Sequence, residues 1–328
     1  MAPDDVLLHL EDVVVRFAPG GFFARGHSFS AVDGVSLTVR RGEVFGLVGE
    51  SGSGKTTVAK ALLRLHEPAA GRILFEGTDI THLPERRLKP MRRRMQMVFQ
   101  DPLASLNPRH RIGDALAAPL KLHRLCAPGD IARTVDRMLS RVGLSPAFKQ
   151  RFPHELSGGQ LQRAAIGRAL LLSPSLLVAD EAVSKLDASV RAQILNLFKD
   201  LQEELKLAIL FITHDLHVAR YLCHRVGVMY FGKLVEVGPA AAMFAAPRHP
   251  YTQALLGTIG EDAALAGAPT LPPDAFRSPH AAPGCRYYDR CPIRQPRCDQ
   301  APPVLGVAAT ASDGDRAVAC WEAPARPA

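Results

Sequence analysis

The stretch "EVFGLVGESGSGKTT", residues Glu43 to Thr57, decides the fold. A short apolar run leads into a glycine-rich loop, and "KTTVAKALLRL" follows it with helical spacing. The loop fits the pattern G-x-x-x-x-G-K-[ST], in which backbone N–H groups surround phosphates, Lys55 reaches the β- and γ-phosphates and Thr56 contacts Mg²⁺. This strand-loop-helix context predicts a nucleotide site. Its phosphate-binding residues are predicted to be Gly49, Glu50, Ser51, Gly52, Ser53, Gly54, Lys55, Thr56 and Thr57.

Strands and helices alternate on both sides of this loop. The first forty residues are dense in Val and Leu and predict strands, with a glycine-rich insertion from Pro19 to Gly26 between them. From residue 161 the chain reads as a helix, the strand "SLLVAD", the helix "ASVRAQILNLFKDLQEEL", the strand "AILFIT" and the hairpin "RVGVMYFGKLVEVG". Such alternation predicts an α/β fold, with a largely parallel sheet and helices on both faces.

Two segments depart from this alternation. Residues 101–160 are polar-patterned and helical, with no convincing strand, and predict an inserted helical subdomain. From about residue 239 the content of Pro, Ala and Gly rises, which marks a linker into a cysteine-bearing tail. We therefore expect a nucleotide-binding core over 1–100 and 161–238, a helical subdomain over 101–160 and a small C-terminal extension over 239–328.

The formal net charge of +8 restricts the class of partner. The clearest basic run, "RRLKPMRRRMQ" from Arg86 to Gln96, is most simply a solvated helix face or loop, although a membrane-side position also suits it. No aromatic residues are interleaved with basic ones, so we expect no nucleic-acid role. Neither an apolar stretch of the roughly 20 residues that a membrane helix needs nor a signal peptide is visible, and a soluble cytoplasmic protein is expected.

Polar side chains end three of the apolar runs. "SLLVADE" ends in two carboxylates at the sheet edge where ligands bind, so Asp180 is placed to hold Mg²⁺ and Glu181 to polarise an attacking water. "LFITHD" brings His214 to the same edge, where a histidine can donate to the γ-phosphate, although a lone strand-end histidine is more often structural. Gln100, at the end of "MQMVFQ", is predicted to contact Mg²⁺ or water beside the helical insertion.

A second glycine-rich element follows far downstream. "LSGGQ", residues 156 to 160, starts an apolar helical pattern, and glycines at a helix start are typical of anion binding. The upstream loop is already a complete phosphate cradle. The chain thus has two phosphate-binding elements and a single nucleotide motif.

The phosphate loop, Gln100, LSGGQ, the acidic pair, a "SKLD" turn and His214 occur in this order over residues 1–235, and together they resemble the nucleotide-binding subunit of an ABC transporter. The resemblance implies a P-loop NTPase with a RecA-like core and an antiparallel β subdomain, which dimerises head to tail. It implies that LSGGQ closes over ATP held by the partner's loop, through Ser157, Gly158, Gly159 and Gln160. It also implies a D-loop with Ser184 and Asp187, and an aromatic stacked on adenine, for which Phe17, Phe22 and Phe23 are candidates.

A finer resemblance covers the whole chain. "FQDPLASLNPR", "PHELSGGQLQRAAIGRAL" and "RHPYTQALL" look like the dipeptide/oligopeptide importer branch, which also includes importers of nickel and other small solutes. "GFFARG" and "ASLNPR" favour the second of two ATPase subunits. The resemblance implies a homologous ATP-binding partner, two permease subunits and an extracytoplasmic solute-binding protein, at the cytoplasmic face of the membrane. A soluble ABC protein of translation or DNA repair is disfavoured, because a second nucleotide domain and a long coiled-coil insertion are both missing from the sequence. The third class of function is a regulatory module that senses iron or redox state through the cysteine tail.

Two residues depart from the family pattern. Ala182 stands where proline is frequent, and Lys185 stands where alanine is common. Both carboxylates of the acidic pair remain, so an active ATPase is expected. Lys185 is expected either to pair with an acid of the dimeric partner or to face solvent.

Four of the six cysteines, Cys285, Cys291, Cys298 and Cys320, lie in the tail. A cytoplasmic chain disfavours disulfides, and the absence of close C-x2–4-C pairs disfavours zinc, but spacing alone leaves the metal open. "GCRYYDRCPIRQPRC" resembles the peptide-importer C-terminal region, and this resemblance implies a [4Fe–4S] cluster, with zinc or free thiols as alternatives. Cys126 and Cys223 are expected to be buried thiols.

Overall fold

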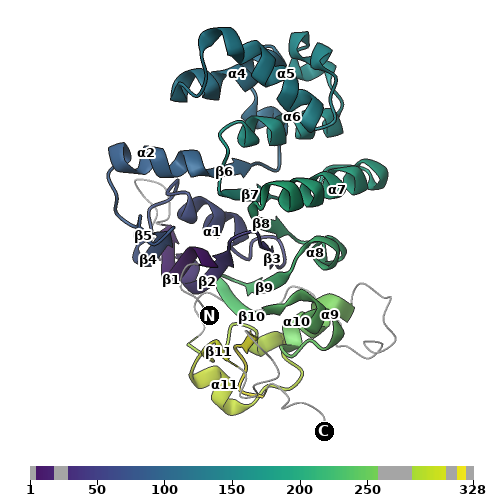
Figure 1. Ribbon diagram of the computed structural model, residues 1–328. Helices are drawn as coiled ribbons and strands as arrows, with labels where there is room; N and C mark the ends of the chain where they lie inside the picture. Colours follow the sequence, from purple (N-terminus) through teal and green to yellow (C-terminus); the bar gives the residue numbers. More distant parts are fainter. Residues whose placement is uncertain (1–4, 18–28, 258–282, 308–315, 323–328) are drawn as a thin grey trace, which may run out of the picture. The chain divides into compact units, whose positions relative to one another are not determined.

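The computed structural model describes residues 5–17, 29–257, 283–307 and 316–322. The chain divides into two compact units. Figure 1 labels the helices and strands that they contain. The first comprises Met1–Leu7, Val39–Val44 and Leu83–Ile212, and the second comprises Leu8–Thr38, Phe45–His82 and Thr213–Ala328. Among the described residues, no helix combines the length and the apolar character that a membrane crossing requires.

The first unit contains three parallel strands, β6 (Met95–Val98), β7 (Leu176–Asp180) and β8 (Ala208–Thr213). Every residue of β7 and β8 is buried, as their continuous apolar runs require in a covered parallel sheet. The helix α7 (Ala188–Leu205) connects β7 to β8. It begins after Asp187, whose side chain accepts a hydrogen bond from the Val190 N–H at 2.9 Å.

Helices are the only regular secondary structure between β6 and β7. Every residue there is described, and none belongs to a strand. These elements are α3 (Pro102–Ser105), α4 (Ile112–His123), η2 (Pro128–Asp130), α5 (Ile131–Arg141), η3 (Pro146–Gln150), η4 (Pro153–Glu155) and α6 (Gly158–Leu170). The basic run predicted as a helix face or loop forms α2 (Glu85–Arg94), which precedes β6.

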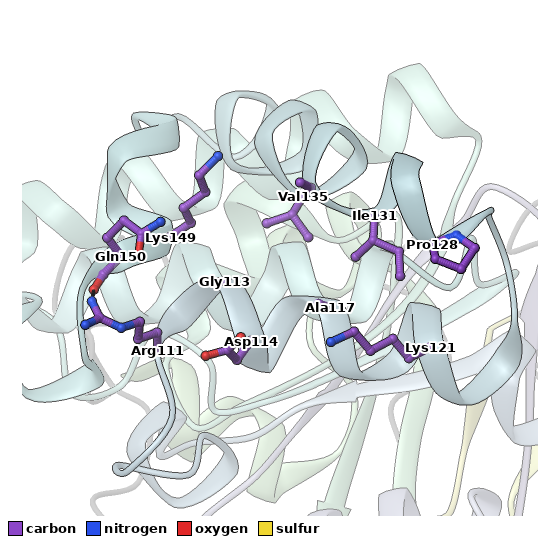
Figure 2. A pocket seen from close by; sticks show the side chains of 11 residues that line it. Arg111, Gly113, Asp114, Ala117, Lys121, Pro128, Ile131, Val135, Lys149 and Gln150 are labelled. Atoms are coloured by element: carbon purple, nitrogen blue, oxygen red, sulfur yellow. Dashed lines mark hydrogen bonds between the residues drawn. The ribbon is translucent and has the colours of Figure 1, made fainter.

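A cavity of about 390 Å³ opens inside this helical segment. Figure 2 shows Ala117 of α4 facing Ile131 and Val135 of α5 across it. Gly113 of α4 allows η3 to pack closely, because a Cβ there would lie 2.9 Å from the Lys149 backbone oxygen. The lining of the cavity therefore combines these apolar side chains with charged ones such as Arg111 and Lys149.

The second unit contains a four-stranded sheet in the order β2 (Phe29–Arg40), β1 (Val6–Phe17), β4 (Ala70–Phe75) and β5 (Thr78–Asp79). β4 runs antiparallel to both of its neighbours. Buried and more exposed residues alternate along β1 and β2, as expected for a sheet with one covered face. The predicted antiparallel β region is confirmed.

The strand β3 (Val44–Val48) leads into the phosphate loop, and α1 (Lys55–Leu62) follows. β3 pairs in parallel with β9 (Arg225–Tyr230), which forms an antiparallel hairpin with β10 (Lys233–Pro239). The remaining elements of the second unit are α8 (Leu216–Leu222), α9 (Ala240–Ala245), α10 (Pro250–Gly257), η7 (Tyr288–Arg290), α11 (Pro296–Gln300), β11 (Gly306–Val307) and β12 (Ala317–Val318). The α/β fold with a parallel sheet is confirmed.

The cysteine-bearing tail is joined directly to the hairpin. β12 pairs with β10, and beside it the Arg316 guanidinium lies 2.7 Å from the fully buried Glu236 carboxylate. Glu236 also accepts hydrogen bonds from the backbone N–H groups of Arg248 and His249, at 3.0 and 2.9 Å. The buried Glu236 carboxylate thus binds both the segment that leads into α10 and the tail.

Candidate functional site

The phosphate loop in the second unit is closed around the ammonium group of Lys55. Its Nζ donates to the carbonyl oxygens of Gly49 and Glu50, at 2.8 and 2.7 Å, and to Ser53 Oγ at 3.3 Å. Lys55 is 4% exposed, whereas Ser51, Gly52 and Thr56 are exposed. The cation is therefore held inside the loop, where a phosphate would meet it, and the exposed Thr56 follows it in the first turn of α1.

Two glycines of the loop are required by the surrounding backbone. A Cβ on Gly49 would lie 2.2 Å from the Met229 carbonyl oxygen, and one on Gly54 would lie 2.3 Å from the Ala31 carbonyl oxygen. Gly52 differs, because a Cβ there meets nothing within 4 Å. The loop is fixed at its two ends and has open space at its tip, as a cradle for a ligand needs.

The C-terminal part of the second unit contacts the first residue after Gly49. The Glu50 N–H donates to the Tyr251 hydroxyl at 3.0 Å, and the Glu50 carboxylate lies 3.3 Å from the Arg290 guanidinium. Arg290 also lies 5.9 Å from the Tyr230 ring centroid. Tyr230, Tyr251 and Tyr287 form a buried aromatic cluster with ring centroids 4.5 to 5.5 Å apart. Sequence reasoning missed this support, because residues 201 and 240 positions away carry no local signal.

The aromatic candidate for adenine is half-buried. The Phe17 ring lies 5.9 Å from Phe29 and 5.3 Å from His66, edge-on. Phe29 is 47% exposed, so it adds an aromatic surface that the sequence did not indicate. Phe22 and Phe23 lie outside the described residues.

The acidic pair ends β7 in the first unit. Asp180 is 5% exposed, and Glu181 follows with the left-handed φ of 46°, a strained conformation for a residue other than glycine. The Gln100 amide donates to the Glu181 carboxylate at 2.8 Å, which leaves the amide oxygen of Gln100 for another ligand. Gln100 and Glu181 are thus brought together as a pair suited to orienting water.

The turn after this pair has its own bonds. Ser184 Oγ donates to the Glu181 carbonyl at 3.0 Å, and the Val190 N–H lowers the pKa of Asp187. Lys185 lies 3.3 Å from Asp101, one residue after Gln100, so it has an intramolecular partner that sequence analysis did not foresee. Ala182 is buried, at 3% exposed.

The LSGGQ segment forms the start of α6. Ser157 Oγ accepts from the Gln160 N–H at 3.3 Å, and the Gln160 side chain accepts from the Ser157 N–H at 3.0 Å, a reciprocal capping box. Ser157 and Gly158 are exposed. Gly159 is buried. Only a glycine fits there without a shift of its neighbour, because a Cβ would lie 2.4 Å from Val190 Cγ1. The exposed pair presents a helix N-terminus, while Gly159 serves packing against α7.

Two further predictions concern single residues. His214 is exposed, between β8 and Asp215, the residue that caps α8. Cys223 is buried, at 8% exposed, against Gly46 of β3. Cys126 is not buried as expected: it is half-exposed, because it lies just after α4 in a loop rather than under a helix.

The other three tail cysteines lie near enough to Cys285 to affect its pKa. Burial raises the pKa of Cys285 to about 11, and Cys291, Cys320 and Cys298 add to this rise. The Cys285 N–H donates to the Cys298 carbonyl at 2.7 Å. Within the described ranges, however, no group of three or more His, Cys, Asp or Glu side chains is placed to hold a metal ion. The number and type of donors suit a metal centre, but their placement does not form a ligand set.

Two family models match the chain. One, described as "ABC transporter", matches residues 32–184, and the other, "Oligopeptide/dipeptide transporter, C-terminal region", matches residues 235–298. The phosphate loop, the acidic pair and the capped LSGGQ helix lie within the first match. The chain belongs to the ATP-binding proteins of ABC transporters, and it is an ABC-type ATPase.

Its relatives are similar over most of their length. The oligopeptide transport ATP-binding protein AppF of Bacillus subtilis is 43% identical, over 94% of this chain and 96% of that protein. The "Probable peptide ABC transporter ATP-binding protein y4tS" of Sinorhizobium fredii is 46% identical, over 96% and 90%. Among solved structures, the ATP-binding cassette MJ0796, a dimer with ADP and Pi, is 27% identical with a TM-score of 0.65, over 71% of this chain and 99% of that one.

Proposed function

We propose that the chain is the ATP-hydrolysing subunit of an importer of dipeptides or oligopeptides. The observation that carries the proposal is the match of residues 235–298 to the C-terminal region of oligopeptide and dipeptide transporters. The names of relatives that are 43 to 48% identical support the same class of solute. In this role the chain acts at the cytoplasmic face of the membrane with two permease subunits, which receive solute from an extracytoplasmic binding protein.

For hydrolysis, the proposal assigns each group a separate task. Lys55 binds the β- and γ-phosphates, and Thr56, Asp180 and Gln100 are the residues that would hold Mg²⁺, which would neutralise charge on the phosphates. Glu181 takes a proton from the attacking water, and His214 donates to the γ-phosphate as charge develops. Gln100 already orients the Glu181 carboxylate at 2.8 Å, which supports this assignment.

The proposal includes a head-to-tail pair of ATP-binding subunits, the second being a homologous chain or another copy. The exposed Ser157 and Gly158, at the N-terminus of α6, are suited to a γ-phosphate held by that partner. The dimeric state of the MJ0796 cassette with ADP and Pi supports such an arrangement.

The test is reconstitution in liposomes with the two permease subunits. Peptide bound to its binding protein should stimulate ATP hydrolysis and accumulate inside, and Glu181→Gln should abolish turnover while ATP stays bound. Glu155→Gln is a matched control, because this exposed carboxylate only caps η4. Stimulation by nickel or another small solute instead of peptide would favour the second candidate, and unchanged turnover in Glu181→Gln would remove that residue from its role.

The [4Fe–4S] cluster is a separate proposal, supported by the four thiols of the tail, Cys285, Cys291, Cys298 and Cys320, and by the bond from the Cys285 N–H to the Cys298 carbonyl at 2.7 Å. It requires the thiol side chains to rearrange, and no step of hydrolysis passes through it. Iron and acid-labile sulfide should be measured per chain after anaerobic purification. Colourless protein with stoichiometric zinc would replace the cluster by a zinc site, and thiols free of either metal would end both.

A further inference from the structure

A second cavity, of about 490 Å³, lies in the first unit beside α2. It is lined by Arg86, Lys89, Pro90, Arg93, Arg94, His123, Leu172 and Ser173. Arg86, Lys89 and Arg93 stand at positions i, i+3 and i+7 of α2, so they share one face of that helix. The basic run is therefore more than a solvated helix surface, because its cations line a concave site.

Few counter-charges line the cavity beside Arg86, Lys89 and Arg93. Among the described lining residues there is no carboxylate. The acid of α2, Glu85, pairs with Arg92 at 2.7 Å, and neither residue lines the cavity. Arg94 donates to Ser175 Oγ at 3.1 Å. Positive charge is thus concentrated on the cavity face.

Helix dipoles are the simplest alternative reason for basic residues here. The C-termini of α2, α4 and α6 lie at or next to lining residues, and each carries about half a negative charge. Together they offset about 1.5 charges, against the three cations Arg86, Lys89 and Arg93. A net positive charge of more than one remains. His123 reflects this environment, because burial and then the charges of Arg93 and Lys89 lower its pKa.

We propose that this cavity binds a ligand with multiply charged phosphate groups, held by Arg86, Lys89 and Arg93. Arginine's planar fork matches phosphate oxygens in a bidentate manner, and lysine adds a compact charge. A ligand with a single carboxylate would leave part of this charge unbalanced. The phosphate belongs either to a soluble polyphosphate or to the headgroup of an anionic lipid. The site includes none of the residues assigned to ATP hydrolysis.

The experiment uses the full chain with Lys55→Ala, so that the phosphate loop does not compete for the probe. Inorganic pyrophosphate is titrated by calorimetry into this chain and into the same chain carrying Arg86→Gln, Lys89→Gln and Arg93→Gln. The affinity should fall at least about tenfold, the equivalent of one charge-assisted hydrogen bond. The matched control is Arg87→Gln, an exposed arginine of α2 outside the lining, which should change the affinity less than about twofold.

Sedimentation with vesicles then distinguishes the source of the phosphate. Retention on phosphatidylglycerol vesicles but not on phosphatidylcholine vesicles, lost in the triple variant, assigns a lipid headgroup; pyrophosphate binding without retention assigns a soluble ligand. If Lys55→Ala impairs folding, the chain with an intact Lys55 is used instead. Pyrophosphate should then bind at two classes of site, the phosphate loop and the cavity, and Lys89→Glu should remove the cavity class. Equal binding by the triple variant, or no binding of either probe by the parent chain, overturns the proposal.

Discussion

The substitution Tyr251→Phe tests whether the C-terminal part of the chain supports the phosphate loop. It removes only the hydroxyl that accepts from the Glu50 N–H at 3.0 Å and keeps the ring, whose centroid lies 4.5 Å from that of Tyr230. Tyr251 is fully buried and its bond to the Glu50 N–H is part-buried, so this donor loses its acceptor in a partly enclosed site. Leaving a buried donor unpaired costs about 1 to 3 kcal/mol.

We expect the free energy of unfolding to fall by that amount. ATP should also bind more weakly. Each 1.4 kcal/mol by which the lost bond destabilises the ATP-bound loop raises the Kd for ATP about tenfold. Urea unfolding followed by circular dichroism measures the first effect, and equilibrium binding of a fluorescent ATP analogue measures the second. Tyr287→Phe is the matched control, because among the described residues the hydroxyl of Tyr287 has no recorded hydrogen bond, although its ring belongs to the same cluster. If the two variants behave alike in both assays, the anchoring role is wrong.

Three other predictions concern stability. Arg316→Met should lower the free energy of unfolding by about 3 to 5 kcal/mol, because it leaves the buried Glu236 carboxylate without its cation. Adding Glu236→Gln should restore most of the lost stability, and urea unfolding that shows no such rescue would contradict the pairing. Burial lowers the pKa of His249 to about 3, so between about pH 6.5 and pH 3 the unfolded chain binds a proton at this residue and the folded chain does not. The free energy of unfolding should therefore fall toward pH 3, by up to about 1.4 kcal/mol per pH unit. His249→Asn keeps an acceptor for the Tyr251 N–H and should flatten this slope, as measured by urea unfolding at several pH values. Lys185→Ala should change the unfolding free energy by less than about 1 kcal/mol, since its pair with Asp101 is 59% and 48% exposed, and a larger loss in the same assay would show a role beyond that pair.

Local patterns predicted the elements around the acidic pair closely. The runs for β7, α7 and β8 matched the observed bounds to within a residue, because continuous apolar strands and the Asp187 cap are encoded in adjacent residues. The phosphate loop was equally readable from its glycines. Its second function as a close backbone contact, at Gly49 and Gly54, was not, because the carbonyls that exclude a Cβ come from distant strands.

Contacts between distant segments could not be read from the sequence. Lys185 and Asp101 are 84 positions apart, and each alone is consistent with a solvated charge. Arg290 lies in a tail whose cysteines drew attention to metal chemistry, yet its observed partner is Glu50. Gly159 belonged to a motif interpreted through phosphate binding, whereas its packing against Val190 depends on the position of α7.

The contact between Arg290 and Glu50 joins residues 240 positions apart, which bears on how the protein matures. During synthesis the ribosome releases the nucleotide cradle long before it makes the tyrosines and the arginine that brace it. A nascent or truncated chain that ends before Tyr251 would therefore carry an intact motif on an unbraced loop. The phosphate loop therefore gains its full support only after translation has passed Arg290.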